Sequence, residues 1–343
     1  MKLIRKKSVL LFFIFGSIIY FVINSIIVFK GKGLSSRVPI INNCIESEWV
    51  VNESNLNKDN FNEFIINGYT VKMPYPDRAV VSDQIIVFYF INEQSSLIIT
   101  PGFAQKNNQS DRALIEMLLK NKTENKDLKR IRKIKFIFNI SDSDNDYDLL
   151  SKIYNTKTDD LKLHGLLHNN IKNICYLIIK TAVLPLNDRI YKVSQKYYDG
   201  FIFDLNNSYI IQLFDREHHQ SLEINIFSED DNILFKKEDV SYLINNLNYL
   251  ESEDSNKINK SYIDEAKINI DNSNWNKASI FLSLAINNSK KDVIGLELML
   301  LDVLNKIGKG EYEGYLISLK TKYRNKKELS KVLEASSKYN QSN

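Results

Sequence analysis

Residues 190–228, IYKVSQKYYDGFIFDLNNSYIIQLFDREHHQSLEINIFS, carry the strongest β-strand signal in the chain. Four β-rich runs follow one another here, at residues 190–198, 201–205, 208–214 and 222–228. Asp199-Gly200 separates the first two runs, and Asp-Gly is favoured in two-residue hairpin turns because these residues accept a positive φ. The stretch therefore predicts an antiparallel meander of four strands.

The segments on either side of the meander extend it to an α+β domain over residues 59–250. Further β-rich runs precede it at residues 68–73, 84–91 and 96–100, the last two forming an expected hairpin. A helix is expected at residues 146–154, whereas residues 171–179 are apolar and compatible with either a strand or a helix. Lys236 to Leu250 predicts an amphipathic helix that covers one face of the sheet.

The N-terminus carries a basic segment followed by a long apolar run. Ser8 to Phe29 contains no charged residue, and a helix of this length spans about 33 Å, enough for a hydrocarbon core of about 30 Å. We therefore expect a transmembrane signal anchor at residues 1–30 and a stalk at residues 31–58. The alternative is a long signal peptide that is cleaved near residues 31–36.

The basic residues that precede the apolar run favour a cytoplasmic N-terminus. On this basis we expect a single-pass protein of the bacterial inner membrane, with its body outside the cytoplasm as a periplasmic domain. The net charge of +4 does not call for a nucleic-acid partner.

The C-terminal residues 258–340 have a helical pattern with regularly placed small side chains. Four of the eight alanines of the chain lie here, and three of them are Ala266, Ala278 and Ala285. Their spacings of 12 and 7 residues, with Tyr262 and Trp275 at aromatic positions, resemble a tetratricopeptide repeat, in which two helices pack closely. The resemblance implies that these five residues pack the repeat, and that the helices form a concave surface that binds another protein.

The resemblance weakens further along the chain. Lys290 stands where the repeat usually closes with proline, Asn269 replaces an aromatic residue, and the next 34 residues match poorly. We expect one complete repeat, one degenerate repeat and a final helix, after a polar linker at residues 251–259. An unrelated helical hairpin is the alternative. Packing of these helices on their own chain, or on a second copy in a homo-oligomer, is also compatible with the pattern.

The order of elements in the middle domain weakly resembles the MOG1/PsbP-like fold. Gly68-Tyr69 leads to Met73-Pro74 in an opening strand, and a meander closed by a helix near Asn245-Asn246-Leu247 follows. This resemblance implies a sandwich-like α+β domain and assigns no catalytic residue.

Candidate ligand sites in the sequence are incomplete. His164 and His168 are spaced for one helical turn, but Gly165 stands where a zinc protease of the His-Glu-x-x-His kind has its general base. Residues 142–153 begin like a calcium loop, yet lack the glycine and the final glutamate. We therefore expect no metal and no cofactor.

Two further groups of residues leave alternatives open. The basic residues Lys129, Arg130, Arg132 and Lys133 form either a solvated loop or a contact with an anionic surface. Cys44 and Cys175 define no disulfide framework; they could pair in an oxidising compartment, although the apolar surroundings of Cys175 favour a buried thiol.

The chain carries no catalytic glycine-rich or nucleophile motif. We therefore expect a membrane-anchored, non-enzymatic, envelope-associated protein-interaction factor that binds its partner through residues 258–340. The alternatives are an envelope hydrolase that uses paired carboxylates of the α+β domain, a toxin-neutralising binding protein of the immunity type, and a purely structural tail.

Overall fold

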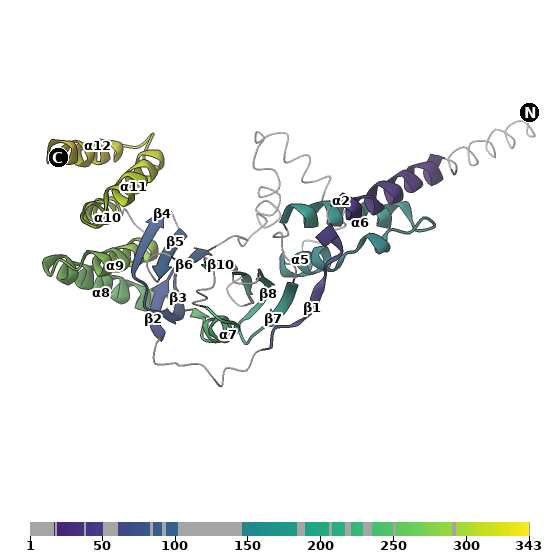
Figure 1. The fold of residues 1–343 in the computed structure, drawn as a ribbon, viewed down its shortest axis with the longest axis horizontal. Coiled ribbons are helices and arrows are strands. Elements are labelled where there is room, and N and C mark those ends of the chain that lie inside the picture. Colours follow the sequence, from purple (N-terminus) through teal and green to yellow (C-terminus); the bar gives the residue numbers. More distant parts are fainter. Residues whose placement is uncertain are drawn as a thin grey trace, which may run out of the picture. The chain divides into compact units, whose positions relative to one another are not determined.

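A computed structural model gives the fold (Figure 1). It describes residues 17, 19–37, 39–50, 61–82, 85–90, 94–101, 146–183, 189–205, 208–216, 221–228, 235–249, 252–289 and 293–342.

Alternating burial defines the hairpin that the sequence predicts at residues 84–100. Strand β5 (Ile85–Phe90) buries every second side chain, and β6 (Ser95–Pro101) does the same. The two strands pair antiparallel with Phe88 opposite Leu97. Because successive side chains of a strand point to opposite faces, this pattern places one face of each strand in the core.

A second hairpin has a turn that the sequence analysis overlooked. Strands β2 (Phe61–Ile66) and β3 (Tyr69–Pro74) are joined by Asn67 and Gly68, with φ of 53° and 82°. Asn-Gly is among the preferred pairs for a two-residue hairpin turn, in which both residues need a positive φ. The pair therefore explains why β2 turns back directly onto β3.

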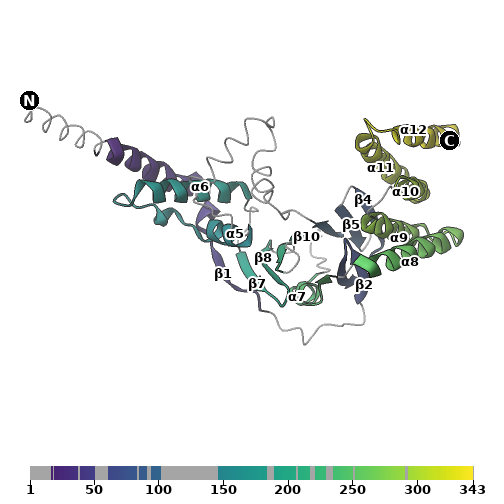
Figure 2. The same ribbon diagram turned by 180° about the vertical axis from the view of Figure 1, so that it is seen from behind.

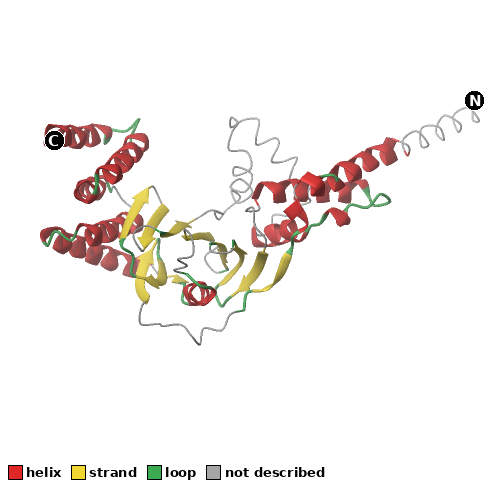
Figure 3. Ribbon diagram, in the orientation of Figure 1, coloured by secondary structure: helices red, strands yellow, loops and turns green. Residues whose placement is uncertain are grey.

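Strands are hydrogen-bonded in the order β1-β7-β8-β9-β10-β6-β5-β4 in a sheet of eight, and β11-β3-β2 in a sheet of three. The strands not yet bounded are β1 (Ile45–Glu48), β4 (Arg78–Ser82), β7 (Arg189–Ser194), β8 (Tyr198–Asp204), β9 (Tyr209–Asp215), β10 (Ser221–Ser228) and β11 (Asn248–Tyr249). β1 pairs with β7 in parallel, so the larger sheet is mixed rather than wholly antiparallel as predicted. The class is α+β (Figure 3).

Within the predicted meander, Asp199-Gly200 does not form the expected turn. Gly200 lies in β8 opposite Val193 of β7, and the turn is closed earlier, where the backbone N–H of Gln195 donates to the carbonyl of Tyr198 at 2.7 Å. The Asp199 carboxylate instead accepts one hydrogen bond from the Arg216 Nε at 2.6 Å and another from the Ser194 hydroxyl on the opposite strand. The Arg216 hydrogen bonds hold the pKa of Asp199 below its ordinary value.

The chain divides into two compact units. The first contains residues 1–49, 103–205 and 213–221, and the second contains residues 50–102, 206–212 and 222–343. Helices of the first unit are α2 (Leu34–Arg37), η1 (Pro39–Asn42), α5 (Asp146–Asn155), η4 (Thr158–Asp160) and α6 (Leu167–Val183). The segment that the sequence left open between strand and helix is therefore part of α6.

The second unit contains the remaining helices. These are α7 (Lys237–Asn245), α8 (Ser252–Asp271), α9 (Trp275–Asn288), α10 (Ile294–Ile307), α11 (Lys309–Lys322) and α12 (Leu329–Ser342). The helix expected to end at Leu250 thus ends five residues earlier and is followed by β11. Helix α8 begins inside the stretch expected to be a linker, residues 251–259.

The predicted transmembrane anchor at Ser8 to Phe29 is corrected by the structure. Among the described residues, no helix is both long enough and apolar enough to cross a membrane. The signal anchor and the single-pass, inner-membrane location built on it are therefore not supported. Residues 1–16 and 18 of this region lie outside the described residues.

The described part of the apolar run, residues 17 and 19–29, is helical and is held within the first unit by a polar side chain. The amide of Asn24 donates to the carbonyls of Leu163 and Gly165, each at 3.0 Å. The amide of Asn170 in turn donates to the Asn24 side-chain oxygen at 2.7 Å. Asn24 is 2 % exposed, so this part of the run packs on the protein's own chain.

Candidate functional site

Side chains of the C-terminal helices complete the outer edge of strand β2. The phenol oxygen of Tyr262 in α8 accepts a hydrogen bond from the backbone N–H of Ile65 at 2.9 Å. The amide of Asn288 in α9 donates to the carbonyl of the same Ile65 at 2.6 Å. Because β2 is the last strand of its sheet, its outer backbone groups need partners from elsewhere. The two helices supply them at Ile65.

Strand β4, at the end of the larger sheet, is covered in a similar way (Figures 1 and 2). The hydroxyl of Ser283 in α9 donates to the carbonyl of Ala79 at 3.1 Å, and both groups are buried. The hydroxyls of Ser82 and Ser318 share a hydrogen bond of 2.8 Å between β4 and α11. Helices α9 and α11 therefore both contact this strand.

An ion pair adds to the contact between β4 and α11. The guanidinium of Arg78 lies 2.5 Å from the Glu311 carboxylate, and its carbon lies 4.4 Å from the ring centroid of Tyr89. Arg78 is only 6 % exposed. A buried charge of this kind needs its partner, since removal of one member leaves the other uncompensated.

The five residues that carry the repeat resemblance have unequal environments. Ala266, Ala278 and Ala285 are fully buried, as the close approach of α8 and α9 requires. Tyr262 bonds a strand edge and lies with its ring centroid 6.1 Å from that of Phe281. Trp275 is only partly buried, so one part of its indole remains on the surface.

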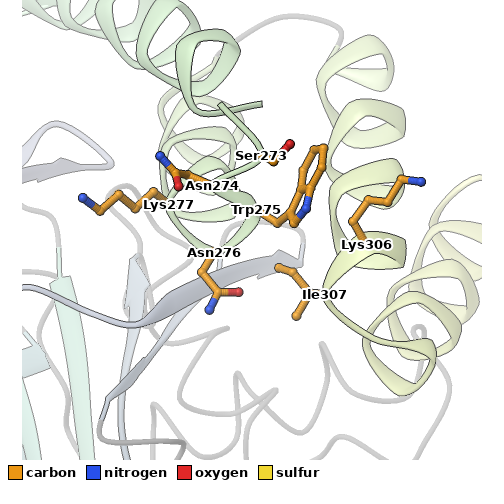
Figure 4. A pocket seen from close by; sticks show the side chains of 7 residues that line it. All are labelled: Ser273, Asn274, Trp275, Asn276, Lys277, Lys306 and Ile307. Carbon is orange, nitrogen blue, oxygen red and sulfur yellow. The ribbon is translucent and has the colours of Figure 1, made fainter. Parts of the chain in front are cut away.

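Trp275 lines a pocket of about 480 Å³ between the first turn of α9 and the last turn of α10 (Figure 4). Its lining consists of Ser273, Asn274, Trp275, Asn276, Lys277, Lys306 and Ile307. The pocket thus combines an aromatic and an aliphatic surface with side-chain amides and a hydroxyl, a composition suited to hold a polypeptide or a small organic ligand.

The charge of the pocket is positive. Its lining includes two lysines and no carboxylate. Helix α9 carries no acidic residue in its first turn, and Asn274 makes no side-chain capping bond there, so the positive end of the helix dipole is not offset locally. Figure 4 shows Lys277 and Lys306 extending in opposite directions from Trp275. The lysines therefore suit an elongated anionic ligand better than one small anion.

Lys277 also contacts Tyr75, which does not line the pocket. The Lys277 ammonium lies 5.9 Å from the Tyr75 ring centroid. Burial, together with the nearby Glu265 carboxylate, raises the pKa of the Tyr75 phenol. This phenol therefore stays neutral near pH 7 and adds an uncharged ring to this end of the surface.

The other sequence candidates do not converge on this pocket. Lys129, Arg130, Arg132 and Lys133 lie outside the described residues, as do residues 142–145 of the calcium-like stretch. His164 lies in a turn before α6 and His168 in its first turn, both exposed, so they are not one helical turn apart. Within the described parts of the chain, no three His, Cys, Asp or Glu residues are grouped to hold a metal ion.

Sequence analysis named only Trp275 among the pocket residues. Lys306 and Ile307 come from the far end of the next helix, and only the antiparallel packing of α9 and α10 brings them to Trp275. Ser283 and Asn288 were missed as well. Their signal was available, since both are polar residues within an otherwise apolar helix, but their strand partners follow only from the fold.

We found no family model, no curated protein and no solved structure that matches this chain. The resemblances to the tetratricopeptide repeat and to the MOG1/PsbP-like fold therefore stay predictions.

Proposed function

We propose that this chain is a non-enzymatic protein-interaction factor that binds an elongated, acidic peptide segment in the pocket between α9 and α10. The observation that carries the proposal is the lining of this pocket. It places a partly exposed indole between two lysines, with amide groups around it and no carboxylate. Tryptophan is enriched where proteins bind other proteins, and charged side chains such as lysine belong to the polar rim of such interfaces.

The geometry favours a peptide over a small anion. The lysines extend to opposite sides of Trp275, so two carboxylates several residues apart on one peptide could each approach one ammonium. An apolar side chain between them would contact the indole and Ile307. Such charge pairs at the rim of an interface mainly select the partner and speed its association.

A fluorescence titration of the full chain tests this proposal. Trp49 is replaced by Phe, which keeps an aromatic ring beside Tyr191 and leaves Trp275 as the reporter. Two synthetic 12-residue peptides are compared, with identical apolar residues but with either glutamates or lysines between them. We expect only the glutamate peptide to change the Trp275 emission in a saturable way.

Charge reversal then locates the binding site. We expect the double variant Lys277→Glu/Lys306→Glu to weaken binding of the glutamate peptide by about tenfold or more. Lys331→Glu, an exposed lysine on α12, is the matched control and should leave the affinity unchanged. Equal responses to both peptides, or equal weakening by the control, would show that the pocket does not select an acidic partner.

A structural role of helices α8 and α9 is a second candidate function, and a different observation favours it. Tyr262, Ser283 and Asn288 bond the backbone of β2 and β4, so α8 and α9 serve their own chain. This role leaves the pocket free, because none of these three residues lines it. The hydrolase alternative gains no support from a pocket without carboxylates, and the toxin-neutralising alternative stays a prediction.

A further inference from the structure

The first unit contains a lysine buried beside a cysteine. Lys180 in the last turn of α6 is 0 % exposed, and its ammonium nitrogen lies 3.9 Å from the sulfur of Cys44. The same nitrogen donates to the carbonyl of Thr156 at 2.9 Å. A buried ammonium is costly unless it has hydrogen-bond partners. The Cys44 sulfur and the Thr156 carbonyl are these partners for Lys180.

Cys44 itself remains accessible. It is a free thiol of intermediate exposure on the segment that precedes β1. Its sulfur lies 3.4 Å from the carbonyl of Asn155 and 3.6 Å from that of Asn42, each of which can accept the thiol proton. The thiol form therefore has two carbonyl acceptors for its proton, whereas the thiolate form has the Lys180 ammonium as its partner.

We propose that Cys44 is a reactive thiol, activated by Lys180, and that it is a site of modification by peroxides and other soft electrophiles. The reactive species of a cysteine is its thiolate, which a neighbouring cation stabilises. The pair differs from an isolated cysteine because a second side chain, wholly buried, is aimed at the sulfur.

The charges around the pair act in both directions. Burial lowers the pKa of Lys180, chiefly by desolvation, and Lys157 acts in the same direction. Cys44 and Asp160 raise this pKa. A negative charge on the Cys44 sulfur therefore favours the charged form of Lys180.

The reaction with hydrogen peroxide balances without a further reactant. The thiol proton passes to solvent, the sulfur forms a bond to one peroxide oxygen, and the O–O bond breaks. The second oxygen takes a proton from solvent and leaves as water. Sulfur is oxidised to a sulfenic acid and the peroxide is reduced.

The chain contains its own reference thiol. Cys175 lies on the same helix α6 as Lys180, is also free and of intermediate exposure, and has its pKa raised by burial. We expect iodoacetamide to alkylate Cys44 several-fold faster than Cys175 at pH 7. Mass spectrometry of the two cysteine peptides from the full chain measures both alkylation rates.

Substitutions assign the effect to the lysine. We expect Lys180→Met to slow the alkylation of Cys44 at pH 7 by about threefold, because the loss of thiolate is partly offset by the higher nucleophilicity of the thiolate that remains. Lys180→Arg should retain most of the rate. Lys172→Met, at another lysine of α6, is the matched control and should change nothing.

Peroxide treatment with dimedone present should label Cys44 several-fold more than Cys175, and Lys180→Met should abolish this preference. The comparison of the two cysteines in the wild-type chain needs no variant, so the proposal remains testable even if Lys180→Met fails to fold. Equal alkylation rates for the two cysteines, or an unchanged Cys44 rate in a folded Lys180→Met variant, would overturn it.

Discussion

The two helical hairpins of the second unit are held by different chemistry. Hairpin α8–α9 contacts β2 and β4 through the uncharged side chains of Tyr262, Ser283 and Asn288. Hairpin α10–α11 depends on charged groups, since Arg78 pairs with Glu311 and Glu297 is buried between α10 and α11. Neutral hydrogen bonds respond little to salt, whereas the loss of one buried charge leaves its partner uncompensated.

The largest expected effect is in the neutral hairpin. Ala278 is fully buried between helices, and Ala278→Arg would force a guanidinium into that space. We expect a loss of about 4 kcal/mol or more in the free energy of unfolding, from overpacking together with a buried unpaired charge. Urea unfolding followed by circular dichroism measures it, with exposed Lys277→Arg as the control. An unchanged midpoint would refute the close packing inferred from the alanine spacing.

The next effect tests the charged hairpin. Glu297 is 2 % exposed and accepts hydrogen bonds from Lys322 at 2.7 Å and from the Tyr323 hydroxyl at 2.5 Å. We expect Glu297→Ala to cost about 3 kcal/mol in urea unfolding, because it leaves both donors without this acceptor. Restoration of stability by Lys322→Met in the same chain would identify the lost Lys322–Glu297 ion pair as the cause. A smaller loss of unfolding free energy for Glu297→Ala than for Tyr262→Phe would show that the buried charge contributes less than a neutral hydrogen bond.

A single strand-edge bond should contribute less. Tyr262→Phe removes only the hydroxyl that accepts from the Ile65 N–H. We expect a loss of about 1 kcal/mol in the free energy of unfolding. This loss should be the same at salt concentrations of about 0.05 M and about 0.5 M. Tyr249→Phe on β11 serves as a comparison for loss of a phenol elsewhere. A strong salt dependence would show that the contact is not a neutral hydrogen bond.

The smallest effect is expected at an exposed ion pair on α11. Lys309 and Glu313 lie 3.7 Å apart with side chains 77 % and 57 % exposed. We expect Lys309→Gln to change the free energy of unfolding by less than about 0.5 kcal/mol. Differential scanning calorimetry of Lys309→Gln and Glu297→Ala side by side compares the loss of an exposed charge with the loss of a buried one. A loss as large as at Glu297 would show that exposure does not govern these pairs.

Local signals predicted much of the secondary structure. Strands β5 and β6 and helices α9 and α10 follow from apolar periodicity, which acts over neighbouring residues. The hairpin turn predicted at Asp199-Gly200 was wrong. Asp199 lies in β8, where it accepts hydrogen bonds from Arg216, a residue 17 positions further along the chain. Residues 251–259 were too polar to predict as helix, yet most of them belong to α8.

The candidate site was far less predictable. Trp275 packs against the hydrophobic core of the second unit but is only partly buried, and the surface beside it is formed by the end of α10. Likewise Asn24 gave no sign of its partners, since the carbonyls that it bonds lie about 140 residues away in sequence. Such long-range pairs depend on the fold rather than on local pattern.

The bonds at Ile65 and Ala79 have a consequence for any shortened form of the protein. A chain that ends before Ser252 would lose Tyr262, Ser283 and Asn288, and would present two open strand edges to other molecules. Exposed edges template pairing between copies. The C-terminal helices thus cover these strand edges and protect the chain against intermolecular β-sheet growth and aggregation.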